Sequence, residues 1–244
     1  FRAPHHSAST PALVGGGSIP KPGEISLAHQ GVLFLDELAE FKSSTMEVLR
    51  QPLEEKMAAV SRVAATCYFP ADFMLVGATN PCKCGFFPDR SRCHCDLGQV
   101  RKYLSKISKP LLDRIDITVE TSMIRYDQLN APLEGENSAS MEKKIEEVYQ
   151  IQQSRFQNSK TRFNAQMNGR EIKEFCKLKE REEKFLARIY EQKHMSVRGL
   201  HKILKVARTI ADFNQKREIG MEDLSEAISY RSLEEKYWNR EDVS

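Results

Sequence analysis

The pattern of apolar residues divides the chain into a mixed first half and a helical second half. Residues 32–35 are four apolar residues in succession, followed directly by Asp36 and Glu37. A run without polar alternation is typical of a strand buried on both faces, as in a parallel sheet covered by helices. Residues 73–78 form a second such run, and Asn80 follows it. Because parallel strands end at one sheet edge, we expect the two carboxylates and Asn80 to meet there.

Shorter patterns predict how the chain approaches and leaves the first strand. Residues 3–23 are rich in Pro, Ser, Gly and His and predict a loop, in which the consecutive glycines at 15–17 form a flexible turn or a hairpin tip. Further on, Ser44 and Glu47 fit a capping box at the start of a short helix. Pro52 is expected to close this helix, because proline interrupts helical hydrogen bonding.

Three more elements are expected in the first half. They are a projecting β-hairpin at residues 55–63, a short helix at 105–112 and a third strand near Ile117. The composition then turns to Asn, Pro, Gly, Ser and Glu, which is typical of a linker. We therefore divide the chain into a first domain at residues 1–123, a linker at 124–140 and a helical domain at 141–244.

The helical domain is predicted from apolar positions three and four residues apart. This spacing marks helices around residues 145–152 and 185–190, and a final helix from about residue 221 to 238. The strongest pattern is one stripe that begins after Ser196 as the N-cap. The stripe consists of Leu200, Ile203, Leu204, Ala207, Ile210 and Ala211.

Length and apolar runs bound the class of protein. At 244 residues the chain can bury a sizeable core. It begins with Phe1 and carries neither a targeting segment nor a tag-like run there, so we expect a portion of a longer protein. No apolar run approaches the roughly 18 residues of a membrane span, which predicts a soluble, cytoplasmic protein.

Charge is small overall but unevenly placed. The chain has 37 basic and 34 acidic residues, a net charge of +3. Residues 82–114 contain eight basic and three acidic residues, so this segment carries +5 and the rest of the chain −2. A basic segment on a near-neutral body indicates a localised contact with an anionic partner such as nucleic acid or nucleotide.

The adjacent carboxylates Asp36 and Glu37 are the first candidates for chemistry. At the end of a buried strand they match the Walker B arrangement of nucleotide hydrolases. Asp36 would hold Mg²⁺, directly or through water, and Glu37 would orient and polarise the water that attacks the γ-phosphate. The alternative is a core strand whose closing acids cap the next helix, and this pair alone does not decide between the two.

Four of the six cysteines lie close together, as Cys82, Cys84, Cys93 and Cys95. Such clustering in a chain without an export signal favours a metal over disulfides. Four thiolates on a short loop can close tetrahedrally on Zn²⁺, although the Cys-x-Cys spacing is tighter than the usual two intervening residues. We expect structural zinc here. Free thiols and a disulfide pair are the alternatives, and His94 is a less favoured substitute ligand.

Taken together, these features resemble an AAA+ ATPase of the magnesium-chelatase-like branch, and more closely the ComM (YifB) family of bacterial competence-associated proteins. The resemblance implies an α/β fold, in which a partial P-loop AAA+ core, with a parallel sheet and a presensor β-hairpin, is followed by an all-helical lid. It covers nearly the whole chain. The segments that carry it are residues 1–6, 22–29, 31–38, 49–54, 80–82, 111–116 and 205–212.

The resemblance also implies roles for four further residues. Asn80 matches sensor 1, which would hold the attacking water or the γ-phosphate. Arg114 matches the arginine finger, which reaches the γ-phosphate bound by the neighbouring subunit. Arg198 matches sensor 2 of the lid, and Arg62 matches a basic residue on the presensor hairpin that touches the nucleic-acid backbone. Taken singly, Asn80 also fits a turn before Pro81, Arg114 an ion pair with Asp113 or Asp116, and Arg198 and Arg62 solvated surface positions.

Two positions depart from the family pattern. The glycine expected before Pro110 is Lys109, close to the arginine finger. The chain also contains no Gly-Lys pair, so the Walker A loop is absent. In this fold the strand before that loop lies between the strand at 73–78 and the one near Ile117. We therefore expect an open slot or a rearranged pairing there, and no ATP hydrolysis by this portion alone.

The function implied by the resemblance is that of an ATP-dependent motor. It would use ATP, Mg²⁺ and Zn²⁺, assemble as a homo-oligomer, namely a hexamer, on branched or single-stranded DNA, and drive branch migration or unwinding in natural transformation or recombination. One alternative is a chelatase-like ATPase that remodels a protein or a metal-insertion target. An alternative of another class is a non-catalytic, zinc-stabilised nucleic-acid-binding module.

Overall fold

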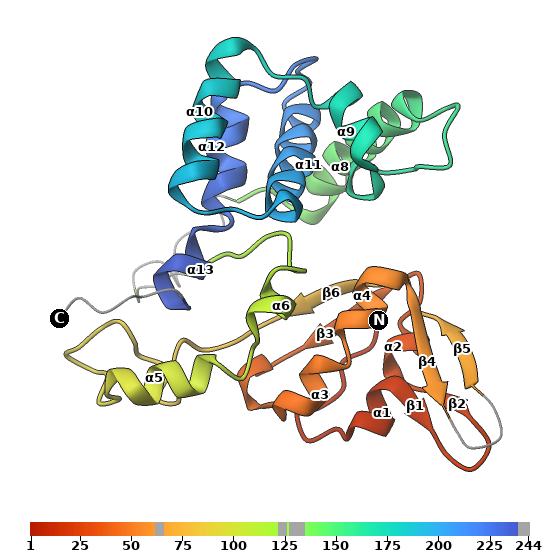
Figure 1. The fold of residues 1–244 in the computed structure, drawn as a ribbon, viewed down its shortest axis with the longest axis vertical. Helices are drawn as coiled ribbons and strands as arrows, with labels where there is room; N and C mark the ends of the chain where they lie inside the picture. The colour runs from red at the N-terminus through yellow and green to blue at the C-terminus, as the bar shows by residue number, and fades with distance from the viewer. Residues whose placement is uncertain (62–65, 122–125, 127–134, 239–244) are drawn as a thin grey trace. The chain divides into compact units, whose positions relative to one another are not determined.

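The computed structural model describes residues 1–61, 66–121, 126 and 135–238. Two compact units are present (Figure 1). Unit 1 comprises Phe1–Ile115 together with the described residues from Glu234 onward, and unit 2 comprises Asp116–Leu233. Unit 1 contains both strands and helices, whereas the regular elements described in unit 2 are all helical. The predicted fold class, a parallel α/β sheet followed by a helical region, is confirmed.

A parallel strand pair forms the centre of unit 1. Strand β3 (Val32–Leu35) pairs with β6 (Met74–Gly77), with Leu35 opposite Gly77. Leu33 and Leu35 are fully buried on one face of β3, while Val32 and Phe34 are half-buried. Both predicted apolar strands are therefore confirmed, and both end at the same edge of the sheet.

The outer strand β6 is less covered than its apolar sequence predicts. Met74 is 64% exposed and Val76 39% exposed. In the described part of the chain, β6 pairs with β3 alone. Apolar side chains on a strand with one open edge are the arrangement that invites further strand pairing.

The third strand predicted near Ile117 is wrong. Residues 115–121 have no regular structure, and the backbone N–H of Thr118 donates instead to the carbonyl of Tyr230 at 2.8 Å. A strand is stabilised by a ladder of backbone hydrogen bonds, and no described strand offers these residues a ladder. Of the two strands expected to flank a slot, β6 is the one that the described residues form.

The glycine-rich segment forms a tight hairpin against the core. Helix α1 (Thr10–Val14) leads into β1 (Gly15–Gly16), which pairs with β2 (Lys21–Pro22) before the short helix α2 (Glu24–Leu27). Gly15 has φ of +114°, and a Cβ there would lie 2.2 Å from the carbonyl oxygen of Lys21. Only glycine fits this position. The predicted hairpin is present, but Gly15 and Gly16 lie in its first strand rather than at its tip.

The helices after β3 differ from the prediction in their ends. A 3₁₀ turn, η1 (Leu38–Glu40), is followed by α3 (Ser43–Glu47) and α4 (Arg50–Glu55). The predicted capping box is wrong. The N-cap of α3 is Lys42, two residues before Ser44, and it makes no side-chain capping bond, while Glu47 accepts hydrogen bonds from Ser108 and Arg50. Pro52 does not close a helix either. It lies in the first turn of α4, where its missing N–H costs nothing.

The predicted hairpin is present with a later second strand. Strand β4 (Met57–Ser61) pairs in antiparallel fashion with β5 (Thr66–Pro70). The expectation that residues 55–63 contain both strands is therefore wrong. Ala58 and Val60 point into the core with a period of two, which explains the alternation. Arg62 lies outside the described residues, so its predicted role stays a prediction.

The helix predicted at residues 105–112 is present but shorter, and a helix that was not predicted precedes it. Helix α5 (Leu97–Leu104) begins at a capping box formed by Asp96 and Gln99, and α6 (Lys109–Leu112) follows the N-cap Ser108. Lys109 takes the first helical position of α6, directly before Pro110. The local turn therefore accommodates lysine where the family pattern has glycine.

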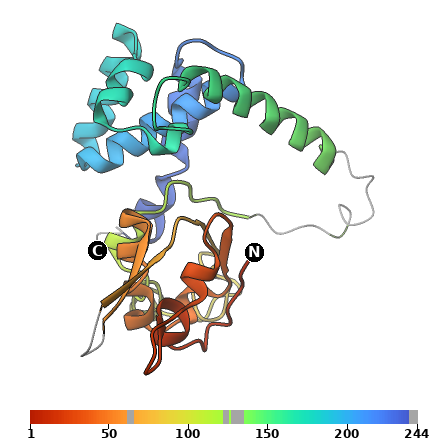
Figure 2. The ribbon, with the colours of Figure 1, turned by 90° about the vertical axis from the view of Figure 1, so that its right-hand side faces the viewer.

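Unit 2 is arranged around helix α11 (Val197–Phe213), which packs against α8, α9 and α12 (Figure 2). The side chain of Ser196 accepts a hydrogen bond from the N–H of Gly199, and Ile203, Ala207 and Ala211 are buried, so the predicted cap and stripe are confirmed. The other elements are α8 (Ser138–Arg155), η2 (Asn164–Gln166), α9 (Gly169–Phe175), α10 (Glu180–Gln192) and α12 (Met221–Ser229).

The final helix predicted at residues 221–238 is broken. Helix α12 ends at Ser229 and α13 (Ser232–Tyr237) follows. The break lets the chain leave the core of unit 2, because the described residues from Glu234 pack with unit 1, where the indole N–H of Trp238 donates to the carbonyl of Leu104 at 3.0 Å. None of the helices described is both long and apolar enough to cross a membrane.

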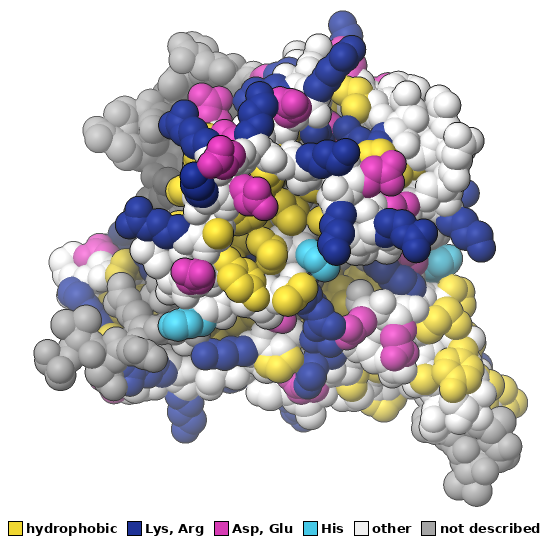
Figure 3. Space-filling model, turned by 45° about the horizontal axis from the view of Figure 1, so that its top comes forward, with side chains coloured by type: hydrophobic (Ala, Val, Ile, Leu, Met, Phe, Trp, Pro, Cys, Tyr) yellow, Lys and Arg dark blue, Asp and Glu magenta, His cyan; other side chains and the backbone are white. Residues whose placement is uncertain are grey.

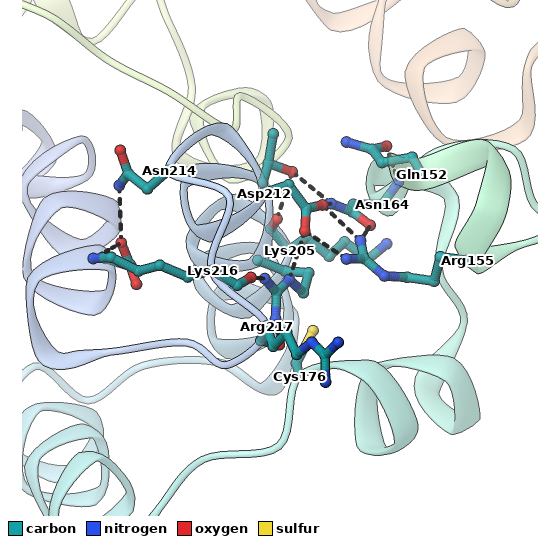
Figure 4. A network of polar contacts seen from close by, with 12 residues as sticks. Gln152, Arg155, Asn164, Cys176, Lys205, Asp212, Asn214, Lys216 and Arg217 are labelled. Carbon is teal, nitrogen blue, oxygen red and sulfur yellow. Dashed lines mark hydrogen bonds and ion pairs between the residues drawn. The ribbon is translucent and has the colours of Figure 1, made fainter. Parts of the chain in front are cut away.

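A buried polar network ties the helices of unit 2 together (Figure 4). The carboxylate of Asp212 is fully buried and accepts hydrogen bonds from Arg155 at 2.6 Å, from Arg208 at 3.0 Å and from Asn164 at 2.7 Å. Arg208 also donates to the backbone carbonyls of Lys216 and Arg217. Two guanidinium groups thus pair with one carboxylate, which is the condition for burying such charges without a large penalty.

Candidate functional site at the edge of the sheet

The ends of β3 and β6 bring the predicted site residues to one edge. The N–H of Leu38 donates to the carbonyl of Ala78 at 2.8 Å, and the N–H of Ala78 donates to the carbonyl of Leu35 at 3.0 Å. These two bonds hold the strand ends together just beyond the regular ladder. Asp36, Glu37 and Asn80 all follow this edge and are exposed. The sheet therefore presents two carboxylates and one carboxamide to solvent at the place where parallel sheets bind ligands.

The backbone at Glu37 is held in a defined conformation. Glu37 has φ of 52° and ψ of 45°, in the left-handed region that costs a non-glycine residue about 1 kcal/mol or more. Its N–H donates to Oδ1 of Asp36 at 2.8 Å. Although Glu37 occupies the N-cap position of η1, its side chain makes no capping hydrogen bond. The helix-capping interpretation of these acids is therefore not what the structure shows.

Sequence reasoning gave no role to His6, which the structure places beside Glu37. Nδ1 of His6 lies 2.6 Å from Oε2 of Glu37. The sequence shows two adjacent histidines in its opening segment, but it does not show which of them reaches the strand end. The contact makes His6 part of the candidate site.

Asn80 begins the loop that carries the cysteines. The hydroxyl of Thr79 donates to the carbonyl of Asn80 at 3.2 Å, and the Asn80 side chain lies about 4 Å from the place of a Cβ on Gly85. Gly85 has φ of +83°. The turn that brings the loop back past Asn80 therefore needs glycine.

Arg114 is held by unit 1 rather than extended into solvent. Its Nε donates to the carbonyl of Arg50 at 3.1 Å, its Nη1 donates to the carbonyl of Pro110 at 2.7 Å, and its Nη2 forms an ion pair with Glu54. The side chain is 14% exposed. It borders an open cleft of about 420 Å³ whose lining includes Glu47 and Glu54. The structure therefore keeps the guanidinium charge paired within the chain.

Arg198 belongs to unit 2, whereas the sheet edge belongs to unit 1. It is the second residue of α11, and it is exposed. The Ser196 cap at the start of the same helix fixes the local backbone around it. Its predicted role as sensor 2 stays a prediction.

The four clustered cysteines converge on one point. The Sγ atom of Cys82 lies 3.3 Å from that of Cys84 and 3.8 Å from that of Cys93, and the Sγ atoms of Cys84 and Cys93 are 3.6 Å apart. All four Sγ atoms, including that of Cys95, lie within 4.8 Å of one another. A tetrahedron with Zn–S bonds of about 2.3 Å has S–S edges of about 3.8 Å. The cluster therefore fits a tetrahedral metal ion such as Zn²⁺.

The surroundings of the cluster favour thiolates at some positions and thiols at others. A backbone hydrogen bond from Phe86, assisted by the thiol of Cys82, lowers the pKa of Cys84 to about 6. Burial raises the pKa of Cys93 to about 11. The N–H of Phe87 also donates to Sγ of Cys82 at 3.4 Å. N–H donors aimed at sulfur stabilise the deprotonated form, which is the form that binds metal.

Cations of the same loop lie over its aromatic rings. The guanidinium of Arg92 is 4.1 Å from the ring centroid of the exposed Phe86, and that of Arg90 is 4.9 Å from the ring of the buried Phe87. On the face drawn in Figure 3, basic and acidic side chains are interspersed rather than separated. The basic excess of residues 82–114 is a local feature of the sequence, because the rest of the chain carries a net charge of −2.

Two family models match this chain. Residues 1–129 match the family described as magnesium chelatase, subunit ChlI, and residues 135–231 match magnesium chelatase, subunit ChlI C-terminal. The first match alone covers more than half of the chain. The chain therefore belongs to the magnesium chelatase family, a branch of the AAA+ ATPases.

Within that family, the predicted resemblance to the ComM and YifB proteins is confirmed. The chain is 45% identical to competence protein ComM of Haemophilus influenzae and 41% identical to the uncharacterized protein YifB of Escherichia coli, in each case over 96% of its length. It is 23% identical over 89% of its length to magnesium-chelatase subunit ChlI-2 of Arabidopsis thaliana. The chain spans about half the length of these relatives, namely 45% of ComM and 46% of the other two.

Proposed function

We propose that this chain is part of an ATP-dependent motor that acts on DNA as a hexameric ring. The observation that carries the proposal is the meeting of the Asp36–Glu37 pair with the end of β6 at one sheet edge, held by the two hydrogen bonds around Ala78. The likeness to competence protein ComM supports DNA as the partner, and branch migration or unwinding during transformation or recombination as the task.

Each site residue has a defined part in this proposal. Bound Mg²⁺ would neutralise the phosphates of ATP, and Asp36 would hold it. Glu37 would accept the proton of the attacking water, while the carboxamide of Asn80 would fix that water or the γ-phosphate. Arg114 and Arg198 would supply positive charge, from a neighbouring subunit and from the lid respectively.

The proposal assigns Arg114 to the nucleotide of a neighbouring subunit. In that case its ion pair with Glu54 is the state of the finger before it meets the phosphate. A variant lacking Arg114 should be inactive alone. Mixed with Glu37→Gln protein, it should recover some activity, because the mixed ring pairs an intact site with an intact finger. No recovery at any mixing ratio would count against the role between subunits.

The phosphate loop that this proposal needs is not in the sequence. Most contacts to the β- and γ-phosphates in such motors come from a glycine-rich loop, its lysine and the following helix N-terminus. We therefore expect the 244-residue chain by itself neither to bind ATP tightly nor to hydrolyse it. Activity should appear in a longer form of the protein that includes residues upstream of Phe1.

The experiment that tests the proposal is ATP hydrolysis by that longer form with Glu37→Gln. Loss of a positioned base lowers turnover by about 10² to 10⁴-fold, while ATP binding is expected to stay close to that of the parent. Glu40→Gln removes the same charge three residues away and is the matched control, with turnover close to parental. Turnover of Glu37→Gln at the parental rate would remove Glu37 from the catalytic role.

DNA dependence separates the motor from its alternatives. A DNA motor should hydrolyse ATP faster with branched DNA than without it, whereas a chelatase-like remodeller should not respond. A non-catalytic nucleic-acid-binding module would bind DNA but would not hydrolyse ATP, even in the longer form of the protein. The local charge of +5 in residues 82–114 favours a nucleic-acid partner over a chelatase-like target.

We also propose that Zn²⁺ is the metal of the cysteine cluster, because the four sulfur atoms already lie at the spacing of a tetrahedral site. One zinc per chain is expected in protein purified without chelator, and Cys93→Ser is expected to lose it. Cys176→Ser changes a buried cysteine outside the cluster and should retain the metal. Protein without zinc under these conditions would contradict the assignment.

A further inference from the structure

The segment that precedes β3 is anchored beside that strand. The N–H of Arg2 donates to the carbonyl of Val32 at 2.9 Å, and the carbonyl of Arg2 accepts from the N–H of Phe34 at 2.8 Å, so Arg2 forms a parallel bridge with Leu33. The Arg2 guanidinium also donates hydrogen bonds to both carboxylate oxygens of Glu24, at 2.6 and 2.7 Å. Because the segment around Arg2 runs parallel to β3, the residues after Arg2 lie towards the end of β3 that carries Glu37.

His6 is held there by contacts on both sides of its ring. The ring lies edge-on to the buried Phe41, with centroids 6.5 Å apart, and its centroid is 4.0 Å from that of His5. Its Nδ1 is 2.6 Å from Oε2 of Glu37. An ionised carboxylate only accepts hydrogen bonds, so Nδ1 carries the hydrogen and donates it.

From this geometry we propose that His6 is a positioning residue for Glu37. This inference rests on the proposed function. The Nδ1–H of His6 holds Oε2, so that Oε1 is the oxygen left to face the attacking water. In the hydrolytic step the water proton passes to Oε1 as the water oxygen bonds to the γ-phosphorus. The bond from that phosphorus to the β,γ-bridging oxygen breaks, ADP leaves with that oxygen and its electron pair, and His6 keeps its own hydrogen throughout.

Two restraints then act on one carboxylate. The N–H bond to Asp36 fixes the backbone of Glu37, and the imidazole fixes the end of its side chain. Orientation of a reacting group contributes to rate through proximity, and it is lost when one restraint is removed. Removing His6 should therefore slow turnover without weakening ATP binding, because His6 touches the base and not the nucleotide in this proposal.

The test compares three variants in the longer, ATP-hydrolysing form of the protein. His6→Ala is expected to lower kcat about 10- to 100-fold, with KM for ATP within about twofold of the parent. His6→Asn keeps an N–H donor close to the position of Nδ1 and should restore most of the rate. His194→Asn changes an exposed histidine of unit 2 that has no part in the proposal, and it is the control with a rate close to parental.

Several outcomes would overturn the inference. A parental or raised kcat in His6→Ala would mean that His6 does not help Glu37, or that it restrains it. An Asn variant no better than the Ala variant would remove the hydrogen bond as the cause. Glu37→Gln is measured alongside. If Glu37→Gln is active, the proposed function has failed at this site. If Glu37→Gln is inactive while His6→Ala is parental, only the inference about His6 has failed.

A second measurement needs no catalysis. In the 244-residue chain labelled with ¹⁵N-histidine, NMR reports which ring nitrogen of His6 carries hydrogen, and His6→Asn assigns the signal. The hydrogen is expected on Nδ1 in the parent and is expected to leave Nδ1 for Nε2 in Glu37→Ala, since the partner of a ring nitrogen sets the tautomer. The same tautomer in both proteins would contradict the hydrogen bond on which the proposal depends.

Discussion

The two units use charged residues in opposite ways. In unit 2, Asp212 is fully buried and is satisfied by two arginines and an asparagine (Figure 4). In unit 1, Asp36 and Glu37 stand exposed at a strand end, and His6 is the described side chain that meets Glu37. A carboxylate surrounded by its own chain holds the fold together, whereas a carboxylate left open at a sheet edge is available to a ligand. The location of the charge, and not its type, separates structure from function here.

The units also differ in how completely they cover their apolar residues. Helix α11 buries its stripe within unit 2, while β6 leaves Met74 and Val76 exposed on unit 1. We expect unit 2 to behave as a closed core and unit 1 to aggregate more readily through β6. Substitutions in each unit test this contrast.

The largest effect is expected from Asp212→Ala in the network of unit 2. Removing one partner leaves the charges of Arg155 and Arg208 buried and unpaired, which costs about 3 to 5 kcal/mol in free energy of unfolding. Urea unfolding measures the change. Glu180→Ala breaks an exposed ion pair with Lys184 and should cost at most about 0.5 kcal/mol. Equal losses in the two variants would mean that the network is not structural.

A smaller and pH-dependent effect is expected from Asp223→Asn. Burial raises the pKa of Asp223, but hydrogen bonds from the Gly220 N–H, Lys216 and Asn214 outweigh it, so the folded pKa is lowered. The unfolded chain therefore binds the proton more readily, and the stabilisation is present above about pH 4 and is lost as pH falls below that value. At pH 7 the variant should lose about 1 to 3 kcal/mol.

Urea unfolding at pH 7, 4 and 3 distinguishes the two states of this carboxyl group. The difference in free energy of unfolding between the parent and Asp223→Asn should become smaller as the pH falls. Glu222→Gln alters a 92% exposed side chain in the same turn and serves as the control, with a nearly constant small gap. A constant large gap for Asp223→Asn would show that its charge is not what stabilises the helix start.

Removing a helix N-cap should lower the free energy of unfolding more in unit 2 than in unit 1. Ser196→Ala removes the cap of the seventeen-residue helix α11 and is expected to cost about 1 kcal/mol. Ser9→Ala removes a longer bond of 3.4 Å at the five-residue helix α1 of unit 1 and should cost less. Thermal unfolding of both variants gives the comparison, and a larger loss for Ser9→Ala would reverse it.

The smallest change in stability is expected from Met74→Lys. Met74 is 64% exposed, so a charge there should alter the free energy of unfolding by no more than about 0.5 kcal/mol. Because a charge on a strand edge opposes pairing with another chain, light scattering should show less aggregation. Met46→Lys places the same charge at a fully buried position and should prevent folding. Unchanged aggregation in Met74→Lys would show that β6 is not the surface that associates.

Local patterns predicted those elements whose structure depends on nearby residues. The apolar runs of β3 and β6 and the stripe of α11 are confirmed, because burial imposes a period on the sequence itself. Element ends were less well predicted. Ser44 and Pro52 carry strong local signals, yet α3 and α4 begin and end elsewhere, since Glu47 bonds to Ser108 from a distant segment.

The sequence by itself determined which residues this protein places after its strands and how its cysteines are spaced. Tertiary structure alone decided their partners. It joined Glu37 to His6, Arg114 to Glu54, and the four sulfur atoms to one another. It also left residues 115–121 without a strand. The physical reason is that hydrogen bonds and ion pairs depend on distances of about 3 Å between atoms, and for residues far apart in the chain only the folded backbone sets those distances.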